Sequence, residues 1–247
     1  MTRVAGVGVL TAWGDGIAAL PGDGDAAARA GDVLVLTPPP LGGERGGERF
    51  RRATRECLLG IAAVEAALRD AGLGRDAIRG SATGLVYVTA AAYGASNAAF
   101  IQAPGAVFFP YTAPSAVPAE VAIEFGLSGA YAIFIGGAAA AGEALAHAGR
   151  LLDRGRCGRA LVVAVETFDA CRELWARGRR LTGRPLTEAA ACAVLEPGES
   201  DVAPASLSVE AVREVRRRAG ETLACAPLIA LGLARARGPG LGAAAGP

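Results

Sequence analysis

Short apolar runs alternate along the chain with segments of helical periodicity, and this alternation restricts the fold more than any other feature. The apolar runs have the length of buried strands and cover residues 4–11, 84–90, 131–135, 160–166 and 190–195. Segments with apolar residues at helical spacing lie between them, at residues 51–73, 115–125 and 138–152. Strands without polar alternation need cover on both faces. We therefore predict an α/β fold with a layered α-β-α arrangement and a mostly parallel sheet.

The remaining segments have the composition of connections. Residues 21–48 are rich in Gly, Pro, Asp and Ala and are predicted to form a loop. After the last strand, a charged segment precedes an apolar helix predicted over residues 221–236, and the Gly/Ala-rich tail over 238–247 is expected to fray. We divide the chain into a domain over residues 1–196 and a C-terminal extension over residues 197–247, with one apolar helix and a flexible tail.

The charge and residue counts exclude several kinds of site. The chain has 25 basic and 24 acidic residues, a net charge of +1, whereas nucleic-acid-binding proteins have a basic excess. All 25 basic side chains are arginine and His147 is the only histidine, which excludes a lysine nucleophile and any mechanism that needs two imidazoles from this chain. The five cysteines form no C-x-x-C pair, so we expect buried, reduced thiols, no metal and no cofactor.

The sequence favours a cytoplasmic protein without membrane contact. No apolar stretch typical of a signal peptide follows Met1. Residues 80–119 carry no charge, but they contain Gly, Pro, Ser, Thr and Asn, which a membrane-spanning helix would not mix so freely. We interpret this segment as a buried part of the fold.

The most informative segment is a strand that runs through two glycines into a helix of small residues. The apolar strand ends at Ile135, Gly136 and Gly137 form the turn, and Ala138 is the first residue of the helix. Such a turn is predicted to hold its first helical residue in a strained elbow at the helix N-terminus. Many enzymes place a nucleophile there, because the helix dipole and free N–H groups stabilise an anion.

Several separate segments match one known family in the same order along the chain. The central matches are Gly129, His147, Gly155 and Glu166, which frame the strand, elbow and helix without a gap. Further matches are residues 4–14, residues 67–73, Pro110, Ser115, Phe125, Gly126, Leu127 and residues 183–186. In these features the chain resembles the N-terminal half of the β-ketoacyl synthases, a branch of the thiolase superfamily. The resemblance covers most of residues 1–196 and implies a thiolase-like half, the N-terminal ketosynthase lobe.

Ala138 departs from the family at the position that decides the chemistry. The resemblance places there the cysteine that carries the acyl chain as a thioester, and a methyl group cannot form one. The two histidines of the family's second half have no counterpart in this sequence. The resemblance therefore implies a catalytically silent subunit, similar to a chain-length factor, with no catalytic residue of its own.

A subunit of this kind implies specific partners. The chain is expected to form a heterodimer with an active ketosynthase, and the acyl chain is expected to stay on that partner and on an acyl carrier protein, in polyketide, polyene or fatty-acid-like biosynthesis. The resemblance implies that Phe108, with Phe109 and Pro110, faces the partner and closes its acyl tunnel. Alternatively, the two adjacent aromatic side chains are ordinary core residues.

Two further surfaces follow from the resemblance. One is a dimer-interface strand that pairs with the same strand of the other subunit and comprises Tyr131, Ala132, Ile133, Phe134 and Ile135. The other is an arginine group that either contacts the carrier protein or forms a solvated helix face, and it comprises Arg213, Arg216, Arg217 and Arg218.

Two other functions stay open at this stage. The chain is alternatively an acyltransferase or hydrolase with a relocated nucleophile, for which Cys171 is the candidate, or a homodimeric scaffold that binds acyl chains. His147 is either a general base or a structural residue on its helix of small residues.

Overall fold

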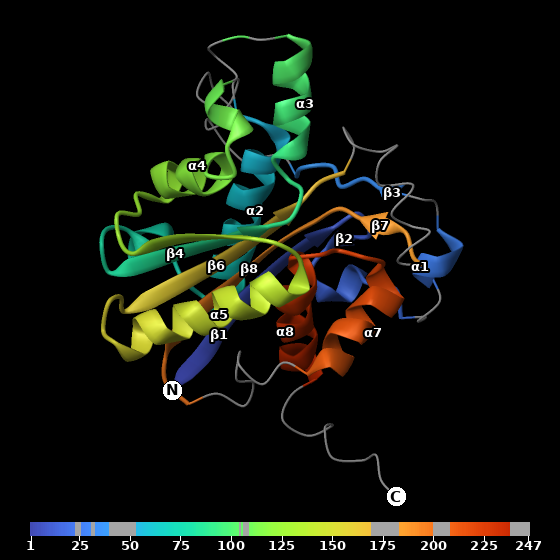
Figure 1. Cartoon of the computed structure of the whole chain (residues 1–247). Coiled ribbons are helices and arrows are strands. Elements are labelled where there is room, and N and C mark those ends of the chain that lie inside the picture. The colour runs from blue at the N-terminus through green and yellow to red at the C-terminus, as the bar shows by residue number, and fades with distance from the viewer. Residues whose placement is uncertain are drawn as a thin grey trace, which may run out of the picture.

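A six-stranded sheet runs through the middle of the molecule in the computed structural model (Figure 1). The structure describes residues 1–22, 26–30, 33–39, 53–103, 105, 109–168, 183–199 and 208–237. Across the sheet the strands are β2 (Gly14–Asp15), β1 (Thr2–Thr11), β8 (Ala189–Pro197), β6 (Arg159–Glu166), β4 (Thr83–Thr89) and β5 (Tyr131–Ile135).

The direction of the strands confirms a mostly parallel sheet. Strand β4 pairs in parallel with both β5 and β6. Strand β8 pairs antiparallel with β6 on one side and with β1 on the other. Strands β1, β4, β5 and β6 therefore point the same way, and β8 runs against them.

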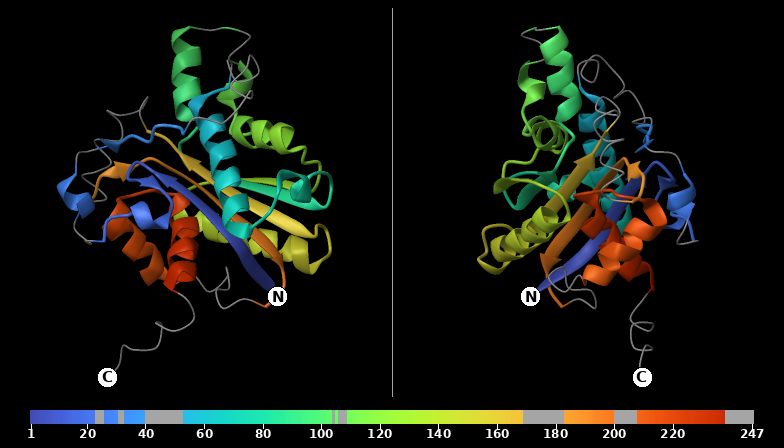
Figure 2. Two further views of the ribbon diagram at one scale, coloured as in Figure 1. Left: turned by 180° about the vertical axis from the view of Figure 1, so that it is seen from behind. Right: turned by 45° about the vertical axis from the view of Figure 1, so that its right-hand side comes forward.

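Helices cover both faces of the sheet, as predicted (Figure 2). One face carries α2 (Arg55–Ala71) and α4 (Ala116–Phe125), and the other carries α5 (Ala138–Asp153), α7 (Val209–Ala219) and α8 (Cys225–Arg237). The strands send alternate side chains into the two cores, because successive residues of a strand point to opposite faces. In β4, for example, Val86 and Val88 belong to the α5 and α8 core, and Leu85 and Tyr87 belong to the α2 and α4 core.

Smaller elements surround this sheet. Strands β3 (Val33–Leu34) and β7 (Leu186–Thr187) pair in parallel. Short helices are η1 (Ile17–Ala19), α1 (Ala26–Arg29), η4 (Arg75–Ile78), α3 (Gly94–Gln102) and η5 (Phe109–Thr112). Helix α3 projects beyond the sheet at the top of Figure 1, and η5 packs beside it.

The predicted helix over 51–73 is α2, and its ends have clear local causes. The Thr54 side chain accepts a hydrogen bond from the Cys57 N–H at the helix start, which satisfies one of the N–H groups that lack an intrahelical partner. Gly72, with a φ of 67°, ends the helix in the left-handed conformation that suits glycine. The charged segment near Arg216 forms α7, in agreement with the helix face that the sequence analysis gave as one alternative, and Ser208 caps it by accepting a hydrogen bond from Ala211 N–H.

Two glycines let β1 approach α2 very closely. A Cβ added to Gly8 would lie 2.3 Å from the Ala63 carbonyl oxygen, and one added to Gly6 would lie 2.6 Å from the Ala67 carbonyl oxygen. Real Cβ atoms do not approach backbone oxygens so closely. The close packing of β1 on α2 therefore requires glycine at positions 6 and 8.

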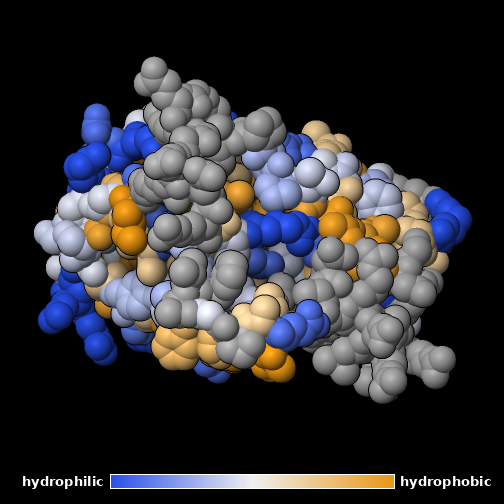
Figure 3. Space-filling view, turned by 90° about the horizontal axis from the view of Figure 1, so that it is seen from above, coloured by the Kyte–Doolittle hydropathy of each residue, from blue (hydrophilic) through white to orange (hydrophobic). Residues whose placement is uncertain are grey.

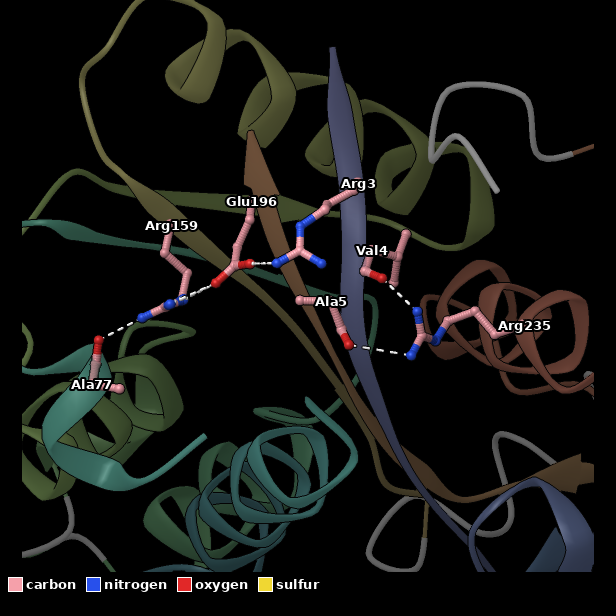
Figure 4. A network of polar contacts seen from close by, with 7 residues as sticks. All are labelled: Arg3, Val4, Ala5, Ala77, Arg159, Glu196 and Arg235. Carbon is pink, nitrogen blue, oxygen red and sulfur yellow. Dashed lines mark hydrogen bonds and ion pairs between the residues drawn. The ribbon is translucent and has the colours of Figure 1, made fainter. Parts of the chain in front are cut away.

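Ion pairs fix one end of the sheet and one end of α2. Glu196 lies between Arg3 and Arg159, and the Arg159 side chain also donates to the Ala77 carbonyl (Figure 4). At the other site, the fully buried Glu188 carboxylate pairs with Arg55 at the start of α2 and accepts the N–H of Phe168 at 2.6 Å. These contacts join segments that lie far apart in the sequence.

The C-terminal extension forms part of the main core. Every residue of α8 from Cys225 to Leu233 is buried against β1, β8 and α5. The tail over 238–247 lies outside the described residues. In the part of the chain that the structure describes, no helix combines the length and apolarity needed to cross a membrane.

Candidate functional site

The predicted elbow is present between β5 and α5, but its unusual backbone conformation is at a glycine. Gly136 has a φ of 149°, and its N–H donates to the Thr89 carbonyl at 2.9 Å. Ala138 begins the regular helix. Among the described residues, Leu223 is the one non-glycine residue with a positive φ, so the expected strain at Ala138 is wrong. Gly136 makes the turn without strain because it has no Cβ.

The start of α5 offers backbone groups and no side-chain chemistry. No side chain caps this helix, and its first turn contains no acidic residue. Ala138 is half-buried and Ala139 is exposed. The helix therefore presents N–H groups where an acyl-enzyme would need a thiolate, and no atom of Ala138 can act as a nucleophile.

The start of α8 lies directly beside the elbow. A Cβ added to Gly137 would lie 3.9 Å from the Leu223 Cβ. The next residue, Ala224, donates its N–H to a carboxylate oxygen of Glu166 at 3.3 Å. The turn before α8 is stabilised by Glu221, which accepts the Leu223 N–H at 2.9 Å. The C-terminal extension thus helps to enclose the position that holds Ala138.

Glu166 joins the ends of three elements beneath the elbow. Besides Ala224 N–H, its carboxylate accepts the N–H groups of Ala90 at 2.7 Å and Ala91 at 3.0 Å, in the loop after β4. Burial raises the pKa of Glu166 to about 8, because the charged form loses water, although these N–H groups act in the opposite direction. The sequence analysis identified Glu166 as a family position, and its contacts here are structural.

His147 is too far along α5 to act at the elbow. It lies nine residues after Ala138, which corresponds to about 13 Å along a helix axis. Its ring packs against Phe134 of β5, with 5.6 Å between ring centroids and 59° between the ring planes. This packing favours the structural role for His147.

The predicted interface strand is β5, and it forms one edge of the sheet. Its described hydrogen-bonded neighbour is β4 alone. Tyr131 is 49% exposed and Ile135 is 53% exposed, whereas Ala132, Ile133 and Phe134 are half-buried. An apolar, unpaired edge is what strand pairing with another molecule requires.

The predicted tunnel residues lie on the projecting part of the molecule. Phe109 is 63% exposed, and its ring centroid lies 5.8 Å from that of Phe100 on α3. Pro110 is also exposed, and Phe108 lies outside the described residues. In the view from above, apolar side chains reach the surface between polar ones at the end of the molecule that carries α3 (Figure 3).

Asn97 positions this projecting part, and the sequence analysis did not single it out. Its side-chain amide donates to the Tyr93 carbonyl at 2.9 Å and to the Thr112 carbonyl at 2.8 Å, so it links α3 to η5. The available signal was a single asparagine within the uncharged segment over 80–119.

The predicted arginine group is largely engaged within the chain. Arg216 forms an ion pair with Glu221 at 2.8 Å, and Arg217 lies 3.5 Å from Glu210. Arg218 donates to the Pro21 carbonyl at 2.6 Å. The contact with a carrier protein stays a prediction for these residues.

The alternative nucleophile cannot be placed. Cys171 lies outside the described residues, so its role stays a prediction. The described cysteines are buried, and burial raises the pKa of Cys57 to about 12, far from the range of a reactive thiolate. Over the described ranges, no three His, Cys, Asp or Glu side chains come together as a metal-binding group.

Comparison with solved structures shows a shared fold. The ishigamide ketosynthase/chain length factor is 20% identical, with a TM-score of 0.60, and the match covers 80% of this chain and 62% of that chain. AntDE:AntF, a type II PKS acyl-carrier protein in complex with its ketosynthase bound to the hexaketide, is 20% identical, with a TM-score of 0.64 and coverage of 79% and 62%. The ketosynthase ApeO in complex with its chain length factor ApeC, from Xenorhabdus doucetiae, is 12% identical, with a TM-score of 0.59 and coverage of 80% and 79%.

The chain spans less than two thirds of the length of the first two structures. No curated protein sequence matches it. The sequence pattern described as "Beta-ketoacyl synthase, N-terminal domain" matches residues 44–199, which is more than half of the chain. The chain therefore belongs to the beta-ketoacyl synthase family and contains its N-terminal domain.

Proposed function

We propose that the protein is a ketosynthase-like subunit without chemistry of its own, which pairs with an active ketosynthase and shapes its acyl tunnel. The observation that carries the proposal is the open apolar edge of β5, which leads into an elbow occupied by Ala138. A catalytic subunit needs a nucleophile at this elbow, whereas a structural subunit needs the edge and not the nucleophile.

The edge of β5 supports pairing with another subunit. An edge strand leaves a row of N–H and C=O groups without partners, and proteins usually block such an edge with charges, proline or a covering element. Strand β5 contains no charged residue and no proline, and its outermost side chains, Tyr131 and Ile135, are apolar and exposed. Pairing with the equivalent strand of a partner would join two sheets into one and remove both edges.

The projecting aromatic group supports a role in setting product length. Phe109 is exposed although it is large and apolar, and Asn97 holds the segment that carries it against α3. An exposed aromatic side chain on a fixed support is typical of a surface that a partner covers. We propose that Phe108, Phe109 and Pro110 meet the partner there and form the floor of its tunnel.

Pairing is tested by co-expression and co-purification with a full-length ketosynthase that retains the family's cysteine and two histidines. We expect a stable complex with the unaltered chain. In Ile135→Lys the amount of co-purified complex should fall at least tenfold, because strand pairing would remove water from the lysine charge without giving it a partner. Ile123→Lys is the matched control, since Ile123 is 64% exposed on α4 and not on β5. The proposal fails if the two proteins never co-purify and the ketosynthase is fully active alone. A homodimer that is equally sensitive to Ile135→Lys would support the acyl-binding scaffold instead.

Product length tests the tunnel residues. We expect Phe108→Ala and Phe109→Ala to lengthen the products of the complex, and Phe108→Trp to shorten them, because a smaller or larger side chain moves the tunnel floor. Mass spectrometry of the products measures the change. If neither truncation nor enlargement alters the product distribution, these residues do not face the tunnel.

A further inference from the structure

The turn before α8 contains two features that cost stability. Leu223 has a φ of 45°, in the left-handed region where the Cβ of a residue other than glycine crowds the backbone. Its neighbour Thr222 is fully buried, and the Thr222 hydroxyl has no hydrogen-bond partner among the described residues. Backbone strain and unpaired buried polar groups persist where the surrounding structure enforces them, and they cluster at functional sites.

Two carboxylates hold the turn in this conformation. The Leu223 N–H donates to the Glu221 carboxylate at 2.9 Å, and Glu221 is in turn paired with Arg216 at 2.8 Å. The next N–H, from Ala224, donates to the Glu166 carboxylate at 3.3 Å. Glycine would adopt the same backbone without strain. These hydrogen bonds therefore account for the conformation, but they do not account for a leucine side chain at this position.

The Leu223 side chain fills the space between the elbow and a small apolar cluster. On one side it contacts the turn into α5, because a Cβ added to Gly137 would lie 3.9 Å from the Leu223 Cβ and 4.0 Å from its Cδ2. On the other side it packs against the buried side chains of Ala91, Phe168 and Leu186.

The space left between Leu223 and the elbow is too narrow for an acyl chain. The two distances place Leu223 within roughly 5.5 Å of the Gly137 Cα, since a Cβ lies about 1.5 Å from its Cα. A methylene chain between two surfaces needs a carbon–carbon contact of about 3.5–4.0 Å on each side, or roughly 7–8 Å in all. An acyl group that passes over Gly137 to position 138 would have to displace the leucine.

We propose that Leu223 is a plug, a side chain that keeps acyl chains out of this subunit's own elbow. The inference rests on the proposed function, in which the acyl chain stays on the active ketosynthase. Ala138 removes the nucleophile, and Leu223 independently removes the space that a bound chain would occupy. The strain at Leu223 then arises because a side chain projects from a turn whose backbone suits glycine.

A thiol introduced at the elbow reports whether this space is closed. Ala138→Cys supplies the thiol, and the acetyl and hexanoyl thioesters of N-acetylcysteamine are the probes. The thiol sulfur attacks the thioester carbonyl and takes the acyl group, and N-acetylcysteamine leaves with the thiol proton. Helix N-termini make thiols more reactive, so a thiol that the probe can reach will be acylated. Mass spectrometry of peptides from the full chain measures the rate of acylation at position 138.

Leu223→Gly, added to Ala138→Cys, should accelerate hexanoylation about tenfold or more and acetylation by a smaller factor, because the space it opens matters most to the longer chain. Leu73→Gly is the matched control, since Leu73 is also a half-buried leucine but packs in the core on the other face of the sheet. It should change neither rate. The proposal is overturned if Leu223→Gly leaves hexanoylation unchanged, or if it accelerates both thioesters equally, as general loosening of the fold would.

Thermal unfolding tests the strain at the same position. Leu223→Ala keeps the strained backbone and Leu223→Gly relieves it, so the glycine variant should unfold about 2–4 °C above the alanine variant. Leu73 has no positive φ, so Leu73→Ala should unfold above Leu73→Gly. A glycine variant that is less stable than the alanine variant at position 223 would overturn the strained plug.

These measurements use the chain without a ketosynthase and are independent of the pairing test. If the acylation rates do not respond to Leu223→Gly, the plug is wrong and the pairing proposal stands. If the chain never co-purifies with a ketosynthase while Leu223→Gly accelerates hexanoylation, the plug stands and the pairing proposal is wrong.

Discussion

Single small residues determine how closely the parts of this protein approach each other. Glycine at positions 6 and 8 brings β1 onto α2, and Gly136 makes the turn into α5. Ala138 then leaves the elbow without a reactive group. At the residue scale, the close packing and the lack of a reactive side chain at position 138 thus both come from side chains that are absent or reduced to a methyl group.

Gly8→Ala should destabilise the protein strongly. The new Cβ would lie 2.3 Å from the Ala63 carbonyl oxygen and 2.4 Å from the Ala67 nitrogen, so the strand or the helix must move. We expect a loss of about 3 kcal/mol or more in the free energy of unfolding, measured by urea denaturation.

Gly142→Ala is the matched comparison, because a Cβ there meets nothing within 4 Å and the residue lies within α5. It should stabilise the protein by about 0.5–1 kcal/mol, since glycine loses more backbone freedom in a helix than alanine does. Equal effects of the two substitutions would contradict the close packing of β1 on α2.

At the scale of elements, the sequence predicts where a strand lies along the chain better than it predicts the strand's direction in the sheet or the contacts that stabilise an element. The apolar run over 131–135 coincides with β5, and the run over 160–166 lies within one residue of β6, because a buried strand needs such a run. The reversal of β8 was not predictable in this way, since an apolar strand has the same composition in either direction. Helix α3 was missed because Gly94–Gln102 has little periodicity and depends on the contacts of Asn97.

The candidate site divides in the same way. The elbow and the absence of a nucleophile follow from local sequence around Ala138. The neighbouring turn before α8 does not, because the contact between Ala224 and Glu166 joins residues 58 positions apart. Such a contact depends on how the whole chain packs, so it cannot be predicted from a local sequence pattern.

Glu166 makes stability depend on pH because it joins the ends of β4, β6 and α8. Its pKa of about 8 in the folded protein exceeds its ordinary value of 4.5, so the folded state keeps a proton that the unfolded state releases between these pH values. Stability should therefore fall as the pH rises from 4.5 to 8, by at most about 1.4 kcal/mol per pH unit. Urea denaturation at several pH values measures this slope.

Glu166→Gln cannot ionise and should lose this dependence, whereas Glu143→Gln, at an exposed position of α5, should keep it. The same slope in Glu166→Gln as in the unaltered protein would show that another group causes the pH dependence.

At the scale of the whole molecule, the C-terminal extension completes the core. Without α7 and α8, one face of β1 and β8 would lose its cover, since the buried side chains of α8 pack there together with those of α5. Helices α7 and α8 are thus part of the folded unit.

A chain that ends at residue 207 should not unfold cooperatively. It would expose the apolar side chains that Leu228, Ile229 and Leu231 now cover. We expect loss of the cooperative thermal transition and aggregation, measured by calorimetry and light scattering. Val209→Ala is the control, because Val209 is 69% exposed on α7 and should leave the transition unchanged. A soluble, cooperative truncated chain would mean that the sheet does not need this cover.

The pairing of β1 with β8 also has a consequence for synthesis on the ribosome. Strand β1 is made first, but its long neighbour begins only at Ala189, so the two must be joined across most of the chain. Contacts between residues so distant in sequence slow folding. The parallel strands β4, β5 and β6 are synthesised before β8, so they can pair with one another while β1 still has no partner strand. A nascent chain of this protein should therefore remain accessible to chaperones until its last helices emerge.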